Sequence, residues 1–190
     1  MVNLENVLSP KCYLAWEKNF RWSPKPKAVL IQLPDLAAVL VSALAWLFIG
    51  FSTGFAIHKV PVRRFDHDTW LTRSRSFEAD GNFYQRRFKI RSWKDRLPEK
   101  GDLFPDGFSK RHIINRSTEH LERFVAETRR AETVHWLNLS AGPLFLIWCR
   151  PLIGVFMILF GICAHLPFVM VQRYNRERLT RVLRRRSPTS

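Results

Sequence analysis

Two long runs of this sequence carry no charged side chain, and they constrain the fold more than any other feature. Residues 36–57 and residues 152–172 are apolar apart from a few uncharged polar side chains. At 1.5 Å per residue, a helix over either run reaches about 30 Å, which is the thickness of the hydrocarbon core of a bilayer. The sequence therefore predicts a mainly α, small integral membrane protein with about three transmembrane or re-entrant helices.

A shorter apolar stretch precedes the second run. Residues 134–149 include a Gly-Pro pair, so this arm crosses a bilayer only if flanking basic side chains snorkel or the lipid thins locally. Arg150 and Pro151 follow, and proline cannot continue the preceding helix, so they predict the tip of a hairpin. We expect residues 134–172 to form a membrane hairpin with both ends on one side, and a re-entrant hairpin is the alternative to two full crossings.

Basic residues outnumber acidic ones, with 31 Lys plus Arg against 16 Asp plus Glu in 190 residues. They flank the apolar blocks, an arrangement typical of segments that meet anionic lipid headgroups or phosphorylated substrates. Because the uncharged runs are of spanning length, we expect a lipid bilayer as partner and no nucleic acid. The cysteines show no pairing or metal-ligand spacing, and we expect no metal and no cofactor.

The remaining segments surround these apolar blocks within a single membrane domain. We expect an interfacial N-terminal segment (residues 1–33), a first membrane helix (34–57), a basic, aromatic-rich and membrane-hugging segment (58–133), and a basic tail (173–190). Because positively charged loops stay inside, the 58–133 segment and the tail are predicted to be cytoplasmic. The topology of the first helix stays open, since a single crossing would leave the basic N-terminal segment outside.

Within the middle segment the local signals are mixed. Residues 88–93 alternate apolar and basic side chains, which fits a short strand or an amphipathic helix. Repeated Pro and Gly predict a loop over residues 97–107. Ser117, followed by Glu119 and Glu122, predicts the N-cap of a helix that runs on toward the hairpin.

Glu132 and His135 lie three residues apart on that helix. They share a face, so the carboxylate can orient the imidazole, and a histidine held in this way is a competent general base for a hydroxyl nucleophile. By spacing alone, the simpler interpretation, that both side chains solvate the membrane interface, is favoured. A metal site is weaker still, because one Glu-x-x-His is half of a di-iron pattern and the chain has no second copy.

The block QRYNR at residues 172–176 leaves the membrane at the surface where Glu132 and His135 enter it, if the hairpin forms as expected. Arginine forks suit phosphate recognition, and amide side chains can fix a sugar hydroxyl or donate to an oxyanion. Surface solvation is the alternative, and the final arginine run reads as a basic membrane anchor. The candidate substrate-binding residues are Trp93, Lys94, Trp136, Gln172, Arg173, Tyr174, Asn175 and Arg176.

Three sequence blocks resemble a known family: WKDRLPEKG at residues 93–101, ETRRAETVHW at 127–136 and HLPFVMVQRYNRERLTRVL at 165–183. Together they look like the bacterial glycosyl-4,4'-diaponeurosporenoate acyltransferases, over about the C-terminal half of the chain plus the first membrane helix by position. The resemblance implies a multi-pass enzyme of the bacterial cell membrane. It implies that a fatty acyl chain is transferred to the glucose of a carotenoid glycoside, the last step toward a staphyloxanthin-like pigment.

The resemblance also implies the substrates, namely acyl-CoA or another acyl thioester and a glycosylated carotenoid or similar glycolipid. We then expect His135, oriented by Glu132, to deprotonate a sugar hydroxyl that attacks the thioester, while Arg173 and Arg176 hold the phosphates of the acyl carrier. No H-x-x-x-x-D pattern follows any histidine, so the glycerolipid acyltransferase mechanism is not implied. The alternative is a non-enzymatic basic scaffold that binds anionic lipid or pathway enzymes.

Overall fold

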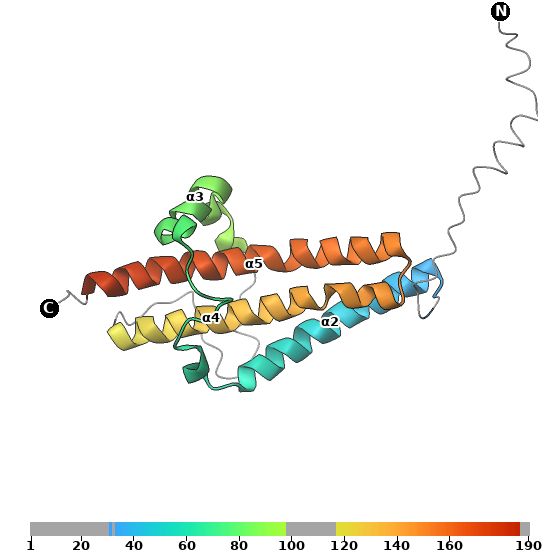
Figure 1. Cartoon of the computed structure of the whole chain (residues 1–190), viewed down its shortest axis with the longest axis horizontal. Coiled ribbons are helices and arrows are strands. Elements are labelled where there is room, and N and C mark those ends of the chain that lie inside the picture. The colour runs from blue at the N-terminus through green and yellow to red at the C-terminus, as the bar shows by residue number, and fades with distance from the viewer. Residues whose placement is uncertain (1–30, 32, 98–116, 187–190) are drawn as a thin grey trace, which may run out of the picture.

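The computed structural model describes Ile31, residues 33–97 and residues 117–186. Within these residues every regular element is an α-helix or a 3-10 turn, so the prediction of a mainly α chain is confirmed. Three long helices lie side by side and form the body of the protein (Figure 1): α2 (Asp35–Lys59), α4 (Thr118–Ser140) and α5 (Pro151–Arg186). The expected interfacial segment lies outside the described residues except for its last few positions, as does most of the expected loop at 97–107.

Helix α2 corresponds to the predicted first membrane helix and continues to Lys59. It begins after Pro34, whose ψ of 143° is extended, and the Asp35 carboxylate lies at the positive end of the helix dipole. It ends before Val60, which is extended as expected for a residue that precedes proline. Only one narrow face of α2, carrying Ala38, Ser42 and Trp46, is buried.

The predicted helical hairpin is formed by α4 and α5, which run antiparallel with the tip at Arg150 (Figure 1). Ser117 caps α4 as expected, since its hydroxyl accepts from the backbone N–H of His120 at 3.3 Å. The first arm of the hairpin is α-helical to Ser140 and then tightens into a 3-10 turn, η7 (Gly142–Ile147). Pro151 opens α5, where its missing N–H costs nothing. Helix α5 continues without a break into the basic tail as far as Arg186.

The half of the bundle around the hairpin tip presents apolar side chains outward. Helices α2 and α5 are both long and apolar enough to cross a membrane by length and composition. Only 17% of the most apolar stretch of α2 and 28% of that of α5 is buried, whereas a core helix of a soluble protein is mostly buried. Large exposed apolar side chains on these helices include Leu40, Leu44, Leu47, Phe48 and Phe51 of α2, and Leu152, Phe156, Leu159 and Phe160 of α5.

Helix α2 packs against the hairpin through small residues and a few polar contacts. A Cβ placed on Gly161 would meet the Trp46 ring at 2.5 Å, so the glycine is what allows α2 to approach α5 this closely. Thr53 donates to the Asn138 side-chain oxygen at 2.5 Å, and Arg150 at the tip pairs with Asp35 at 3.1 Å. These contacts fix the position of α2 along the axis of the hairpin.

The segment between α2 and α4 covers the other half of the hairpin with short elements: η2 (Val62–Phe65), η3 (Ser76–Gly81), α3 (Asn82–Phe88), η4 (Ile90–Ser92) and η5 (Lys94–Arg96). The suggested strand over residues 88–93 is wrong, and so is a continuous amphipathic helix there. Helix α3 ends at Phe88, and Lys89 adopts a left-handed conformation with φ of 47°, which interrupts either repeat.

Candidate functional site

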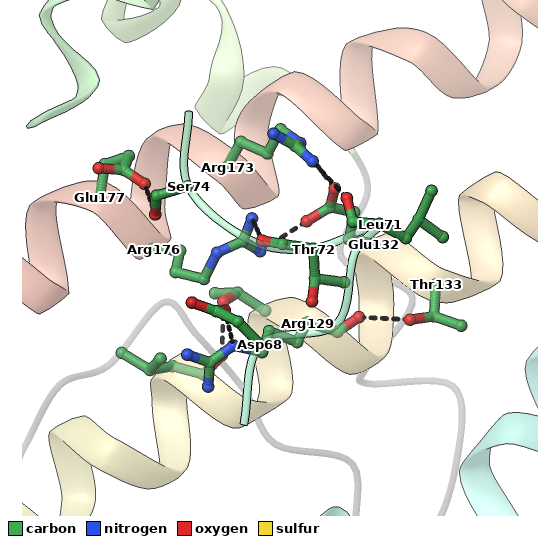
Figure 2. Close-up of polar contacts among 12 residues, drawn as sticks. Asp68, Leu71, Thr72, Ser74, Arg129, Glu132, Thr133, Arg173, Arg176 and Glu177 are labelled. Carbon is green, nitrogen blue, oxygen red and sulfur yellow. Dashed lines mark hydrogen bonds and ion pairs between the residues drawn. The ribbon is translucent and has the colours of Figure 1, made fainter. Parts of the chain in front are cut away.

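A buried ionic network joins α4 to α5 where the apolar half of the hairpin ends. Glu132 is fully buried, and its Oε1 accepts from Arg173 Nε at 2.6 Å while its Oε2 accepts from Arg176 Nη1 at 2.5 Å (Figure 2). Trp136, one turn further along α4, donates its Nε1–H to Glu132 Oε1 at 3.0 Å. The hairpin therefore places Glu132 level with the two arginines, as the sequence predicts.

A chain segment that we call the strap, residues 66–81, crosses over this network (Figure 2). Arg173 Nη2 donates to the Leu71 carbonyl oxygen at 2.5 Å, and Arg176 Nη2 donates to the Thr72 carbonyl oxygen at 2.6 Å. Arg173 Nη1 also donates to the Glu78 carboxylate at 2.9 Å. The two arginines thus tie α4, α5 and the strap together, with two carboxylates balancing two guanidinium groups.

Glu78 is the strap's own buried carboxylate. Burial alone would raise its pKa, but hydrogen bonds donated by the Tyr84 hydroxyl, the Arg75 backbone N–H and Arg173 outweigh this effect, so the pKa of Glu78 lies below its ordinary value. Burial, together with the neighbouring Glu78 carboxylate, raises the pKa of Tyr84 above the usual range of tyrosine. Glu78 is therefore ionised and Tyr84 neutral near neutral pH.

The lowered pKa of Glu78 predicts a loss of stability in acid. A carboxyl group whose pKa is lower in the folded than in the unfolded chain stabilises the fold fully above its unfolded pKa, here about 4.3, and loses that contribution as pH falls through the folded value. We expect the thermal unfolding midpoint of detergent-solubilised protein to fall as pH is lowered from about 6 to below about 4, and to fall less in Glu78→Gln. Equal acid sensitivity in the two proteins would contradict the assignment.

His135 lies one turn from Glu132, but the contacts observed around its ring come from α5. Its Nδ1 lies 3.2 Å from the Nδ1 of His165, and its ring stacks on Phe168 with centroids 4.7 Å apart. Both histidines are more than nine-tenths buried. The Glu132 carboxylate is engaged by Arg173, Arg176 and Trp136, and a polar group observed against His135 is His165.

The part of the chain that contains this site is similar in sequence to a known protein family. A family model described as glycosyl-4,4'-diaponeurosporenoate acyltransferase matches residues 67–185, which include nearly all of the strap, the ionic network and both histidines. The chain belongs to this family. Proteins of that name from Staphylococcus aureus strains N315 and USA300 are each 30% identical over 142 residues, covering 75% of this chain and 86% of the relative. No solved structure matches the chain.

Membership of this family makes the chain an acyltransferase, and it decides against the non-enzymatic scaffold. The matched range also contains all of the candidate residues from the sequence, but the structure does not bring all of them together. Glu132, Trp136, Arg173 and Arg176 meet in one network. His135 lies against His165, and Tyr174, Trp93 and Lys94 have other partners.

Tyr174 is buried on another side of α5, under α3, where its hydroxyl accepts from Arg91 Nε at 2.8 Å. Trp93 packs in the same cluster and donates its Nε1–H to the Phe88 carbonyl oxygen at 2.8 Å, and Lys94 forms an ion pair with its neighbour Asp95. Gln172 and Asn175 are half-buried on α5. Trp93 and Lys94 therefore belong to the segment between α2 and α4 that covers the hairpin, which we call the cover (residues 62–96), and their observed partners lie in the same segment.

His165, Glu78 and Thr72 belong to the observed site but were not among the candidates from the sequence. His165 had a usable signal, because His165, Val169, Arg173 and Arg176 are spaced by four, four and three residues and form one buried stripe of α5. Glu78 had none, because it meets Arg173 across 95 residues of sequence. Among the described residues, no group of three or more His, Cys, Asp or Glu side chains is placed to hold a metal ion.

Proposed function

We propose that this acyltransferase transfers a fatty acyl chain from acyl-CoA or another acyl thioester to a sugar hydroxyl of a glycosylated lipid, with a carotenoid glucoside as the first acceptor to test. The observation that carries the proposal is the position of His135 and His165, at the boundary between the apolar half of the bundle and the strap-covered polar half. The relatives from Staphylococcus aureus are glycosyl-4,4'-diaponeurosporenoate acyltransferases by name, which supports this acceptor class.

A boundary of this kind suits a reaction between two amphiphiles. The apolar chains of both substrates can lie along the outward apolar faces of α2 and the first half of α5, while the sugar and the thioester meet at the level of the histidines. In this arrangement α2 and the hairpin lie in the bilayer of the bacterial cell membrane. The strap, α3 and the basic end of α5 face the cytoplasm, in keeping with the preference of positively charged segments for that side.

His135 acts as the general base in the proposed reaction. It accepts the proton of the sugar hydroxyl as the hydroxyl oxygen bonds to the acyl carbonyl carbon, after which the carbon–sulfur bond breaks and the thiolate leaves, taking up a proton to become the free thiol. The products are a sugar ester and the carrier thiol. No further co-reactant is needed.

Arg173 and Arg176 have a different role from the phosphate binding expected from the sequence. Both guanidinium groups donate to buried carboxylates and to strap carbonyl oxygens, so phosphate contact would require them to give up these partners inside the protein. We assign them to holding the strap against the hairpin. Exposed basic side chains of the cover, such as Arg86, Arg87 and Lys89, are better placed to meet a phosphorylated acyl carrier.

The test is acyl transfer by the purified full-length protein in detergent micelles. Labelled acyl-CoA is offered with a panel of glycolipids that includes a carotenoid glucoside, a glucosyl diacylglycerol and an alkyl glucoside, and the ester product is followed by mass spectrometry. We expect an ester on the carotenoid glucoside. Ester on another glycolipid alone would reassign the acceptor, and no ester with any acceptor, from protein whose thermal unfolding is cooperative, would overturn the proposed substrates.

A further inference from the structure

We propose that His165 is a positioning residue that fixes the tautomer of His135, so that His135 Nε2 carries the lone pair needed to accept the proton of the sugar hydroxyl. The inference rests on the proposed function and adds to it a residue on α5 that neither the family comparison nor the spacing on α4 indicates. The observation behind it is the contact between the two Nδ1 atoms.

The two Nδ1 atoms lie 3.2 Å apart in a site where both rings are more than nine-tenths buried. That distance is within the range of a hydrogen bond, and a hydrogen bond between two ring nitrogens needs one proton shared between two lone-pair positions. One Nδ1 therefore donates and the other accepts. Two imidazolium rings would each carry a proton at Nδ1 and would repel one another, so this contact holds at least one ring neutral.

The shared proton decides what each ring presents at its other nitrogen. In a neutral pair, the ring that donates from Nδ1 carries a lone pair at Nε2 and can act as a base. The ring that accepts at Nδ1 carries its proton at Nε2 and can act as a donor. If His135 donates to His165, His135 is the base, and His165 plays the part that a carboxylate plays for the histidine of a Ser-His-Asp triad.

Neighbouring aromatic rings pack against both histidines and hold them in the orientation of this contact. His135 is stacked on Phe168 with an interplanar angle of 15°, and the His165 ring lies 5.7 Å from the Trp46 ring, centroid to centroid. Trp46 itself stacks on Phe145 at 4.8 Å. Helices α2 and α5 thus supply the aromatic walls of the histidine pair, Phe145 of η7 supports Trp46 from behind, and neither histidine ring can turn without disturbing a neighbour.

Trp46 adds an independent sign that a ligand atom is accommodated at this junction. It is buried, and within the described part of the chain its Nε1–H has no hydrogen-bond partner. A buried donor without an acceptor is costly, and native structures rarely leave one. An acceptor oxygen from a bound substrate, such as the acyl carbonyl oxygen, would satisfy it.

The experiment compares two variants that separate the hydrogen-bond acceptor from the bulk of the ring. His165→Phe keeps an aromatic ring and removes the acceptor, whereas His165→Asn places an amide oxygen near the position of Nδ1. We expect His165→Phe to lower kcat by about 100-fold or more with KM little changed, because general-base catalysis contributes roughly 10² to 10⁴. We expect His165→Asn to stay within about tenfold of wild type. His67→Asn, at an exposed histidine of the strap, is the matched control.

A second readout does not depend on activity. In protein labelled with ¹⁵N-histidine, the nitrogen shifts of His135, identified by their absence in His135→Phe, report which nitrogen carries the proton. We expect the Nδ1–H form in wild type and in His165→Asn, and a changed tautomer distribution in His165→Phe. Wild-type His135 in the Nε2–H form would overturn the inference, as would a folded His165→Phe with wild-type kcat.

These outcomes are separable from a failure of the proposed function. If wild type forms no ester with any glycolipid, the substrates are wrong, while the tautomer measurement still tests the histidine pair. If wild type forms ester and both His165 variants match it in kcat and in the nitrogen shifts of His135, the function stands and the role of His165 falls. Equal large losses in both His165 variants with a changed KM would indicate a merely structural role and would also overturn the inference.

Discussion

Replacing Glu132 by alanine is expected to lower the free energy of unfolding by about 3–5 kcal/mol, which is a large part of the stability of most single domains. Glu132 is fully buried and accepts hydrogen bonds from Arg173 and Arg176 at 2.6 and 2.5 Å. Without it, the network keeps two buried guanidinium groups but only one carboxylate, that of Glu78. The strap should loosen as well, because the same two arginines hold its carbonyl oxygens.

The measurement is thermal and denaturant unfolding of wild type and variants in one detergent. Asp35→Ala is the matched control, since it removes the carboxylate of an exposed ion pair with Arg150 and should cost less than about 1 kcal/mol. A quadruple variant with Glu132→Leu, Arg173→Met, Arg176→Leu and Glu78→Gln should recover much of the loss, because it removes all four charges of the network and an apolar core can replace a buried ionic cluster. If Glu132→Ala were no more destabilising than Asp35→Ala, the network would not hold the fold together.

The arrangement of the hairpin could be predicted because it depends on the lengths of apolar runs and on one turn. The uncharged run from 152 to 172, the shorter arm before it and the Arg150-Pro151 tip between them predict two antiparallel helices. Antiparallel partners in turn place residues near 132 beside residues near 173. The placement of Glu132, Arg173 and Arg176 at the same end of the hairpin therefore followed from the sequence.

The partners within that meeting point could not be predicted. Helical spacing places Glu132 and His135 on one face, but that face meets α5, and arginines there compete with the imidazole for the carboxylate. A guanidinium group offers several donors in a fixed fork, so it holds a buried carboxylate better than a single ring nitrogen does. The strap adds Glu78 across 95 residues with no periodic signal. His165 lies within an otherwise uncharged apolar run, whose composition predicts contact with lipid.

Removing the imidazole of His135 is expected to reduce acyl transfer by about 10² to 10⁴, because the sugar hydroxyl would lose its general base. The reduction should fall mainly on kcat, since His135 contacts Phe168 and His165 within the bundle and does not belong to the exposed apolar surface that would take the substrate chains. The comparison is between wild type and His135→Ala, with initial rates of ester formation measured against acyl-CoA and acceptor concentration.

Two further variants make the His135 result interpretable. His135→Gln keeps a polar side chain of similar size, so it leaves a smaller cavity next to Phe168 than His135→Ala does. It therefore separates a loss of activity caused by the missing base from one caused by a cavity. His67→Ala removes an exposed histidine of the strap and should leave the rate unchanged. Large losses in both His135 variants, with unfolding midpoints near that of wild type, would fit the general base. Undiminished product in a folded His135→Ala would keep the acyltransferase but remove His135 from the reaction, and the base would then have to be sought elsewhere along the boundary between the apolar half and the strap.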